Sequence, residues 1–304
     1  MRTLKALVLR NTKMFFKDKG MFFTALITPA ILLVLYISFL YNVYEDSFSS
    51  IFPAELNVDE KLVKGLVGGL LLSSLLAVSC VTVSFCANLF MVQDKVTGAR
   101  YDLTIAPVKP HTLALGYYLS TAISGLVISC IATLLGMIYL AVIGWYMSFT
   151  DVCLMFLDVL LLVLFGTALS SLVCYPLSTQ GQISAVGTIV SSGYGFICGA
   201  YMPISSFSAG LRNTLSFLPG TYATSLIRNH ALAGVFREME SLCYPEEIIK
   251  TVRDVADCNL YFFNSSVATW QMYLILIGSI LFLAGMYVLI HVLRVKKTLK
   301  SKNK

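Results

Sequence analysis

The stretch from residue 112 to residue 150 reads TLALGYYLSTAISGLVISCIATLLGMIYLAVIGWYMSFT and contains no charged side chain. A helix needs about 20 mainly apolar residues to cross the hydrocarbon core of a bilayer. This stretch is longer than one crossing requires. Its composition predicts a membrane-spanning helix, because burying so much apolar surface away from water is strongly favourable.

Five other stretches along the chain have the same character, and the sequence therefore predicts an all-α integral membrane protein with six spans. The predicted spans cover residues 21–44, 65–92, 112–150, 152–174, 183–200 and 268–292. Asp158 is the one acid inside a span, where a charge costs about 2.5–3.5 kcal/mol on insertion scales. A structural hydrogen bond is the favoured role for Asp158, and a proton relay is the alternative.

The composition of the whole chain supports a membrane protein. Of its 304 residues, 57% are hydrophobic and 12% are charged, and the mean hydropathy is +0.80. Soluble domains carry about 25% charged residues. The net charge is +6, but the basic residues lie beside apolar runs, which indicates membrane orientation rather than a nucleic-acid partner.

Lysine and arginine gather in three segments, at residues 1–20, 93–111 and 293–304. Most of the acids lie in the other connections. Cytoplasmic loops of membrane proteins carry an excess of lysine and arginine, and an even number of spans places all three segments on one side. We therefore expect a multi-pass protein of the cell membrane, with both termini in the cytoplasm.

Two segments outside the spans have a predicted structure of their own. Residues 1–20 predict an amphipathic helix at the membrane surface, acting either as an anchor only or also as a contact for a cytoplasmic partner. Residues 201–267 are too polar for one more span. They predict an outer re-entrant hairpin of two short helices, at residues 205–217 and 220–233, followed by an external amphipathic helix at residues 245–257.

Cys243 and Cys258 flank that external helix. A bond between them would close a loop of about 15 residues and stabilise the protein by roughly 3 kcal/mol. Two free thiols are the alternative, and the sequence leaves the choice open.

Catalytic and metal-binding patterns are missing from the sequence. It has no G-x-x-x-x-G-K-[ST] phosphate loop, no H-E-x-x-H, no G-x-S-x-G and no C-x-x-C. We therefore expect no enzyme activity, no metal and no cofactor in this chain.

Two local stretches resemble the type-2 permeases of ATP-binding-cassette (ABC) exporters. The first is DKVTGARYDL at residues 94–103, with APV at residues 106–108. The second is GAYMPI at residues 199–204, followed by LPGTY at residues 218–222 and LIR at residues 226–228. With the predicted topology, the resemblance covers nearly the whole chain and implies one permease domain over residues 1–304.

The resemblance also implies functional roles. Residues 93–111 would form a cytoplasmic coupling loop that docks on a separate ATPase, which would bind ATP and Mg²⁺. The coupling residues would be Lys95, Gly98, Arg100, Asp102 and Pro107. The substrate path would be lined by Phe85, Asn88, Phe90, Ser191, Tyr194 and Phe196. An outer gate would contain Pro203, Pro219, Tyr222 and Arg228.

The working unit implied by the resemblance has two permeases, identical or paralogous, and two ATPases in a lipid bilayer. Its substrate would be a drug, a lipid, an antimicrobial peptide or a glycan. Two other functions remain as alternatives. An ion-coupled carrier would need inverted repeats and intramembrane acids, of which the sequence offers little. A membrane scaffold or sensor would use the outer segment as a partner-binding surface.

Overall fold

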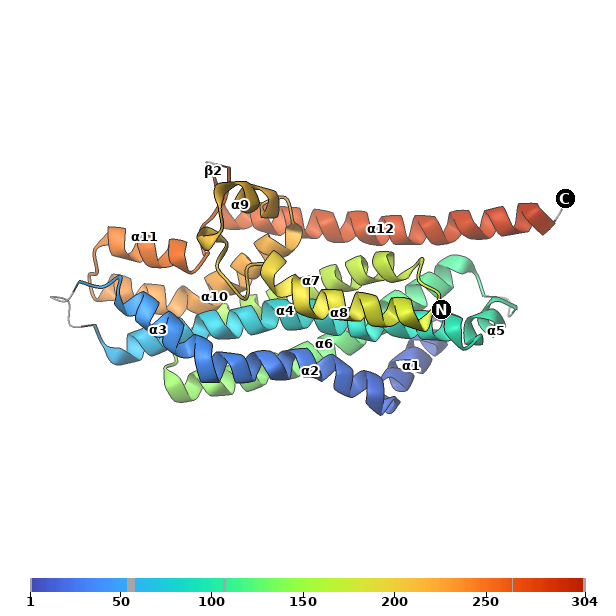
Figure 1. Ribbon diagram of the computed structural model, residues 1–304, viewed down its shortest axis with the longest axis horizontal. Helices are drawn as coiled ribbons and strands as arrows, with labels where there is room; N and C mark the ends of the chain where they lie inside the picture. Colours follow the sequence, from blue (N-terminus) through green and yellow to red (C-terminus); the bar gives the residue numbers. More distant parts are fainter. Residues whose placement is uncertain (1, 54–57, 106–107, 264, 303–304) are drawn as a thin grey trace.

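The computed structural model describes residues 2–53, 58–105, 108–263 and 265–302, and these form an elongated bundle of helices with one short β-hairpin (Figure 1). The helices are α1 (Arg2–Lys17), α2 (Lys19–Leu35), the π-helix η1 (Tyr36–Leu40), α3 (Tyr41–Ser49), α4 (Glu60–Val96), α5 (Ala99–Ile105), α6 (Pro110–Ile143), α7 (Phe149–Cys174), α8 (Gln180–Ile197), the 3-10 helix η2 (Ile204–Ser206), α9 (Ala209–Leu215), α10 (Pro219–Ser241), α11 (Glu246–Val255) and α12 (Thr269–Lys302). The hairpin pairs β1 (Leu260–Phe262) with β2 (Ser265–Val267) in antiparallel register.

Helix α4 is the central element of the bundle. Its most apolar segment is completely buried, and α2, α6, α7, α8 and α10 all pack against it. Glycines allow this close packing: a Cβ atom at Gly166 of α7 would lie 3.0 Å from the Cα atom of Val81. Small residues at helix contacts let backbones approach closely, which is how membrane helices associate without a hydrophobic driving force.

Five helical stretches are long and apolar enough to cross a membrane: Lys19–Ser49, Glu60–Val96, Pro110–Ile143, Phe149–Cys174 and Thr269–Leu293. They correspond to the first, second, third, fourth and sixth predicted spans. The fifth predicted span corresponds to α8, which has 18 residues and does not reach the same hydropathy. The count of six spans therefore stays a prediction. Helix α8 nevertheless runs along the bundle beside α4 (Figure 1).

The three basic segments lie together at one end of the bundle. Helix α1, helix α5 and the C-terminal part of α12 occupy this end, and α3 and α11 occupy the opposite end (Figure 1). We call the first the basic end and the second the acidic end. Since both chain ends lie at the basic end, this arrangement matches the charge distribution that underlies the predicted orientation.

The expected N-terminal helix is present as α1, and it packs against the bundle. Leu7, Asn11 and Phe15 are buried on one face, mainly against α6, while Leu9 is 64% exposed on another. Gly116 of α6 makes room for this contact, because a Cβ atom there would lie 3.1 Å from the Cβ atom of Leu7. The helix is thus part of the folded bundle as well as amphipathic.

The segment between α8 and α12 differs from its prediction in one respect. Two short helices were expected at residues 205–217 and 220–233. The first is the short α9, but the second belongs to α10, which has 23 residues and packs against α4, α7 and α12. The amphipathic helix expected at residues 245–257 is present as α11, which buries Ile249 and Val252; its external position stays a prediction. The re-entrant position of this segment in a membrane stays a prediction.

The two cysteines beside α11 are free thiols in the structure. Cys243 is exposed and has a left-handed backbone conformation, with φ of 57°, at the turn after α10. Cys258 is buried, with 2% of its surface exposed, at the end of α11. One thiol thus faces outward and the other lies inside the fold, and the choice between a bond and two free thiols stays a prediction.

Candidate functional site

A long groove runs between α2 and α8, with η1 and α4 forming the rest of its wall. Its volume is about 860 Å³. The α8 wall is rich in hydroxyl side chains, including the exposed Ser184, Thr188 and Ser192, whereas α2 supplies mostly apolar side chains such as Ile27 and Ile31. Ligand pockets of about 300–1,000 Å³ typically combine apolar walls with a few polar groups. The α2–α8 groove fits that description.

The six residues predicted to line a substrate path fall into two groups. Ser191 and Phe196 of α8 line the α2–α8 groove, and Tyr194 of the same helix is buried, with 8% of its surface exposed. The three residues of α4 lie within the bundle instead. Phe85, Asn88 and Phe90 are 4%, 0% and 6% exposed, respectively. Their helix is the central one, so these side chains face other helices of the same chain.

Asn88 is held by polar side chains of two neighbouring helices. Its Nδ2 atom donates to the Oγ atoms of Ser170 and Ser171 of α7, at 3.1 Å each. Thr121 of α6 donates to its Oδ1 atom at 3.4 Å. Buried amides that are fully hydrogen-bonded fix the register of helices. In this single chain Asn88 therefore joins α4, α6 and α7.

The predicted coupling residues lie at the basic end, where α4 turns into α5. Lys95 donates from Nζ to the backbone oxygens of Tyr175 and Leu177, at 2.5 and 2.7 Å, just beyond the end of α7. The C-terminus of a helix carries a partial negative charge, which a lysine stabilises. Arg100 lies over the ring of Tyr175, with 6.0 Å between Cζ and the ring centroid. Lys95 thus ties the end of α4, and Arg100 ties α5, to the segment that follows α7.

An aromatic cluster extends this connection to α12. The ring of Tyr175 contacts Tyr287 and His291, at centroid distances of 6.3 and 4.6 Å. Tyr287 is completely buried, and its hydroxyl lies 3.3 Å from the Sδ atom of Met91 in α4. Helix α5 is therefore connected through Arg100 and Tyr175 to α12, and through Tyr287 to α4.

Two further predicted coupling residues, Gly98 and Asp102, lie on the exterior of the turn from α4 into α5. Gly98 is exposed and has φ of 82°, a left-handed conformation that suits glycine between α4 and α5. Asp102 is exposed on α5, as are Tyr101 and Ile105, at 69% and 66%. Pro107 lies outside the described residues. Helix α5 thus presents a mixed apolar and acidic face to its surroundings.

Sequence reasoning did not single out a buried carboxylate beside the turn from α4 into α5. Asp94 accepts two hydrogen bonds from the guanidinium of Arg10, at 2.7 and 3.1 Å, and a third from the hydroxyl of Tyr117 at 2.7 Å. The hydrogen bond to Asp94 raises the pKa of Arg10 above its usual value. Through Asp94, α1 and α6 are fixed to the end of α4 that leads into α5.

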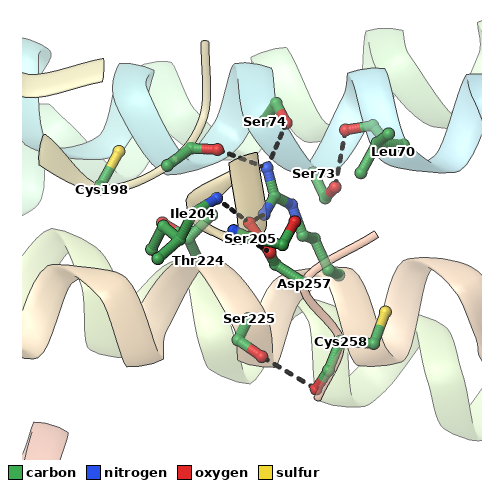
Figure 2. A network of polar contacts seen from close by, with 12 residues as sticks. Leu70, Ser73, Ser74, Cys198, Ile204, Ser205, Thr224, Ser225, Asp257 and Cys258 are labelled. Atoms are coloured by element: carbon green, nitrogen blue, oxygen red, sulfur yellow. Dashed lines mark hydrogen bonds and ion pairs between the residues drawn. The ribbon is translucent and has the colours of Figure 1, made fainter. Parts of the chain in front are cut away.

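The predicted outer gate forms a polar junction between α4, α8, α10 and the end of α11 (Figure 2). Arg228 is 1% exposed and pairs with Asp257 at 3.0 Å. Its other nitrogen donates to the Ser74 hydroxyl at 3.2 Å and to the Gly199 oxygen at 2.7 Å. Asp257 also accepts from the backbone nitrogens of Ile204 and Ser205.

The other three predicted gate residues surround this junction. Pro203 precedes η2, and Pro219 occupies the first turn of α10, where its missing N–H is no loss. Tyr222 is buried and donates to the backbone oxygen of Ser216. These residues lie at the turns between helices. The junction therefore stabilises the connections between α8, α10 and α11.

Two acid–base pairs join α7 to α10. Asp158 is 2% exposed; its Oδ2 atom lies 2.5 Å from the Nδ1 atom of His230, and its Oδ1 atom accepts from the Tyr273 hydroxyl of α12 at 2.6 Å. Arg237 pairs with Asp151 seven residues earlier in α7. His230 and Tyr273 are the hydrogen-bond partners that the predicted structural role of Asp158 requires.

Sequence reasoning assigned no partner to His230, although a shared spacing relates the two pairs. Seven residues separate Asp151 from Asp158, and seven separate His230 from Arg237. Two antiparallel helices whose acids and bases share a seven-residue spacing form both pairs on one contact face. Across the described residues, no group of three or more His, Cys, Asp or Glu side chains is arranged to hold a metal ion.

Comparison with known families gives one match. The family model for the membrane domain of the ABC-2 type transporter matches residues 2–231, which is about three quarters of the chain. No curated protein matches the chain. The matched range includes the α2–α8 groove, helix α5 and Arg228. This chain therefore belongs to the ABC-2 type transporter family and is a multi-pass membrane protein of the permease type.

Proposed function

We propose that this permease exports its substrate along the α2–α8 groove, and that two copies meet at this groove in the working transporter. The observation that carries the proposal is the hydroxyl-lined α8 wall. Polar side chains in membrane helices are better tolerated facing protein or a water-filled cavity than facing lipid. A second permease copy and a substrate path between the two would cover this wall.

A separate ABC ATPase is the proposed source of energy. Permeases of this family normally work with an ATPase partner. The exposed face of α5 offers Tyr101, Asp102 and Ile105 as a docking surface at the basic end. A movement of α5 would reach α7 and α12 through Arg100 and Tyr175. Coupling then requires that the ATP-bound and ATP-free ATPases bind α5 with different free energies.

Exposed aromatic side chains in the segment between α8 and α12 support a position of this segment at the outer membrane–water interface. Phe217 is 63% exposed, and its ring contacts those of Phe262 and Phe263 at 5.2 and 6.1 Å. Trp270 is 63% exposed at the start of α12. Exposed aromatic rings of this kind gather where the membrane meets water. The proposed orientation places this aromatic group in the outer interface and the basic end in the cytoplasm.

The proposal is tested on the purified complex. The full chain should co-purify with a nucleotide-binding subunit, and Asp102→Lys should lower ATP hydrolysis by the complex at least about tenfold. Lys250→Glu is the matched control, because Lys250 is exposed on α11 at the acidic end. A chain that purifies without any ATPase, or hydrolysis unaffected by Asp102→Lys, would contradict the docking surface.

The groove and the orientation have tests of their own. Ser191→Trp fills the groove and should abolish efflux across a panel of drugs and lipids, whereas Ile189→Trp, on an exposed face of α8 outside the groove, should not. An amine reagent that cannot cross membranes should label Lys250 but not Lys13 in intact cells. Labelling of Lys13 would reverse the proposed topology.

A further inference from the structure

A second cavity, of about 480 Å³, lies between α2, α4 and α6. It is distinct from the α2–α8 groove and opens between α2 and α6. Its walls are almost wholly apolar, and they include Leu26 and Pro29 of α2, Leu75 of α4, and Ile128 and Ala132 of α6. We call it the α2–α6 cavity.

The sequence explains why this space exists. Helix α6 approaches α4 closely at Gly136, where a Cβ atom would lie 2.1 Å from the Cδ1 atom of Leu72. On the opposite wall, α2 presents the ring of Pro29 and the small side chain of Ala30. Close packing on the α6 side and small or irregular groups on the α2 side leave the gap between them unfilled.

The mouth of the α2–α6 cavity faces the lipid. Leu33 of α2 is 44% exposed at its rim, and Ile131 and Leu135 of α6 are 53% and 63% exposed. Helices α2 and α6 belong to stretches long and apolar enough to cross a membrane. A solute in water has no route to such a mouth, whereas the hydrocarbon chains of the bilayer lie directly against it.

The inner wall of the cavity carries a hydroxyl group with no hydrogen-bond partner among the described residues. This is Ser79 of α4, whose surface is 1% exposed. Two other serines of the same helix, Ser73 and Ser84, donate to backbone oxygens one turn earlier, at 2.8 and 2.7 Å. A buried hydroxyl without a partner is costly, and serine in a helix usually bonds in this local way. Ser79 lies near the middle of α4 and is almost fully buried, so it offers no anchor for a lipid headgroup, and the apolar side chains of the walls select the occupant.

We propose that the α2–α6 cavity binds one acyl chain of a bilayer lipid. The α6 wall runs from Ile128 to Tyr139, which is about 16 Å of helix at 1.5 Å per residue. An extended hydrocarbon chain matches this long, apolar and laterally open space. The cavity volume also falls in the range of known ligand pockets.

A bound chain would act on α2. This helix is a wall of both the α2–α6 cavity and the α2–α8 groove, and the side chain of Tyr36 borders both spaces. An acyl chain on one side supports α2 against α6 and α4, and by linkage it stabilises the folded state in which the cavity exists. The lipid site is thus separate from the proposed substrate path and does not depend on it.

The experiment measures photolabelling of α4, a helix whose burial keeps it away from the surrounding lipid. The full chain, with any subunit that co-purifies, is reconstituted in phosphatidylglycerol–phosphatidylethanolamine vesicles containing a phospholipid with a diazirine on its acyl chain. After irradiation, labelled peptides are mapped by mass spectrometry. We expect labelling within residues 71–79 of α4, which lipid outside the cavity cannot reach because this segment is buried.

Matched variants decide the result. Ala132→Phe fills the cavity and should lower the α4 labelling at least about tenfold, and Ala30→Phe should do the same from the opposite wall. Ile138→Phe, on an exposed part of α6 outside the cavity, should leave it unchanged.

Label confined to exposed residues of α2 and α6 in the unmodified chain would overturn the site. So would α4 labelling that persists in both filled variants. The readout is independent of ATP hydrolysis and of efflux, so its failure is distinguishable from failure of the exporter proposal.

Discussion

The buried pair between Arg228 and Asp257 allows the sharpest test of the fold. Asp257→Ala removes the only carboxylate that contacts the Arg228 guanidinium among the described residues, and it also removes the acceptor for the backbone nitrogens of Ile204 and Ser205. Both charged side chains are almost fully buried, at 1% and 3% exposure. The change therefore leaves a largely buried cation and two amide donors without their acceptor.

The expected cost follows from these contacts. Removing one partner of a buried ion pair typically costs about 3–5 kcal/mol, because the other charge stays buried and uncompensated. Arg228 retains two neutral acceptors, the Ser74 hydroxyl and the Gly199 oxygen. Both bind Nη2, so Nη1 loses its acceptor and the charge stays uncompensated. We therefore expect a loss of about 3 kcal/mol or more, and a smaller loss when Arg228→Met is combined with Asp257→Ala than the two single losses summed.

The assay is thermal unfolding of the full chain in detergent, with Asp254→Ala as the control. Asp254 lies three residues earlier, is only half-buried, and accepts from Asn259 and Tyr261. Asp257→Ala should lower the midpoint by roughly 10 °C, and Asp254→Ala by much less. Equal midpoints for the two variants, or strictly additive losses in the double variant, would refute the reasoning about the buried charge.

Three further predictions concern other contacts. Asp158→Ala leaves His230 and Tyr273 without their shared acceptor and should cost roughly 3 kcal/mol in detergent unfolding, about twice the loss from Tyr273→Phe; equal losses would contradict the shared hydrogen bonds. Burial raises the pKa of the Cys258 thiol to about 12, so a maleimide at pH 8 should modify the exposed Cys243 and leave Cys258 intact in the folded protein, as read by peptide mass mapping. Gly234→Ala would place a Cβ atom 2.0 Å from the Tyr146 oxygen and should cost about 1–3 kcal/mol, whereas Gly278→Ala, with open space around it, should cost nothing measurable.

Much of the fold follows from local sequence. Four of the predicted spans correspond closely to α4, α6, α7 and α12, because the hydropathy of about 20 consecutive residues is enough to specify a crossing. The short helix between Gly98 and Pro107 and the amphipathic α11 were also predictable, since caps and apolar spacing are local features. The full length of α10 was not predictable, because its polar composition resembles that of a loop and only its packing against neighbouring helices explains the helix.

The candidate site was only partly predictable. Sequence resemblance singled out Arg228, but not Asp257, whose partner lies 29 residues away. It also singled out Asn88 and Phe85 as path residues, although α4 is the central helix and buries both. Which face of an all-apolar helix points inward carries no signal in its own composition, because apolar side chains serve equally well against lipid and against protein.

The sequence by itself determined that this chain is a membrane protein of long helices, with its basic segments at one end of the bundle. Hydropathy and charge act segment by segment, so they can be read along the chain. Only the tertiary structure decided that α4 lies at the centre, that Asp94 joins α1 to α6, and that Asp158 meets His230. Those pairings depend on the register between helices distant in sequence, which close packing and buried hydrogen bonds fix once the helices have come together.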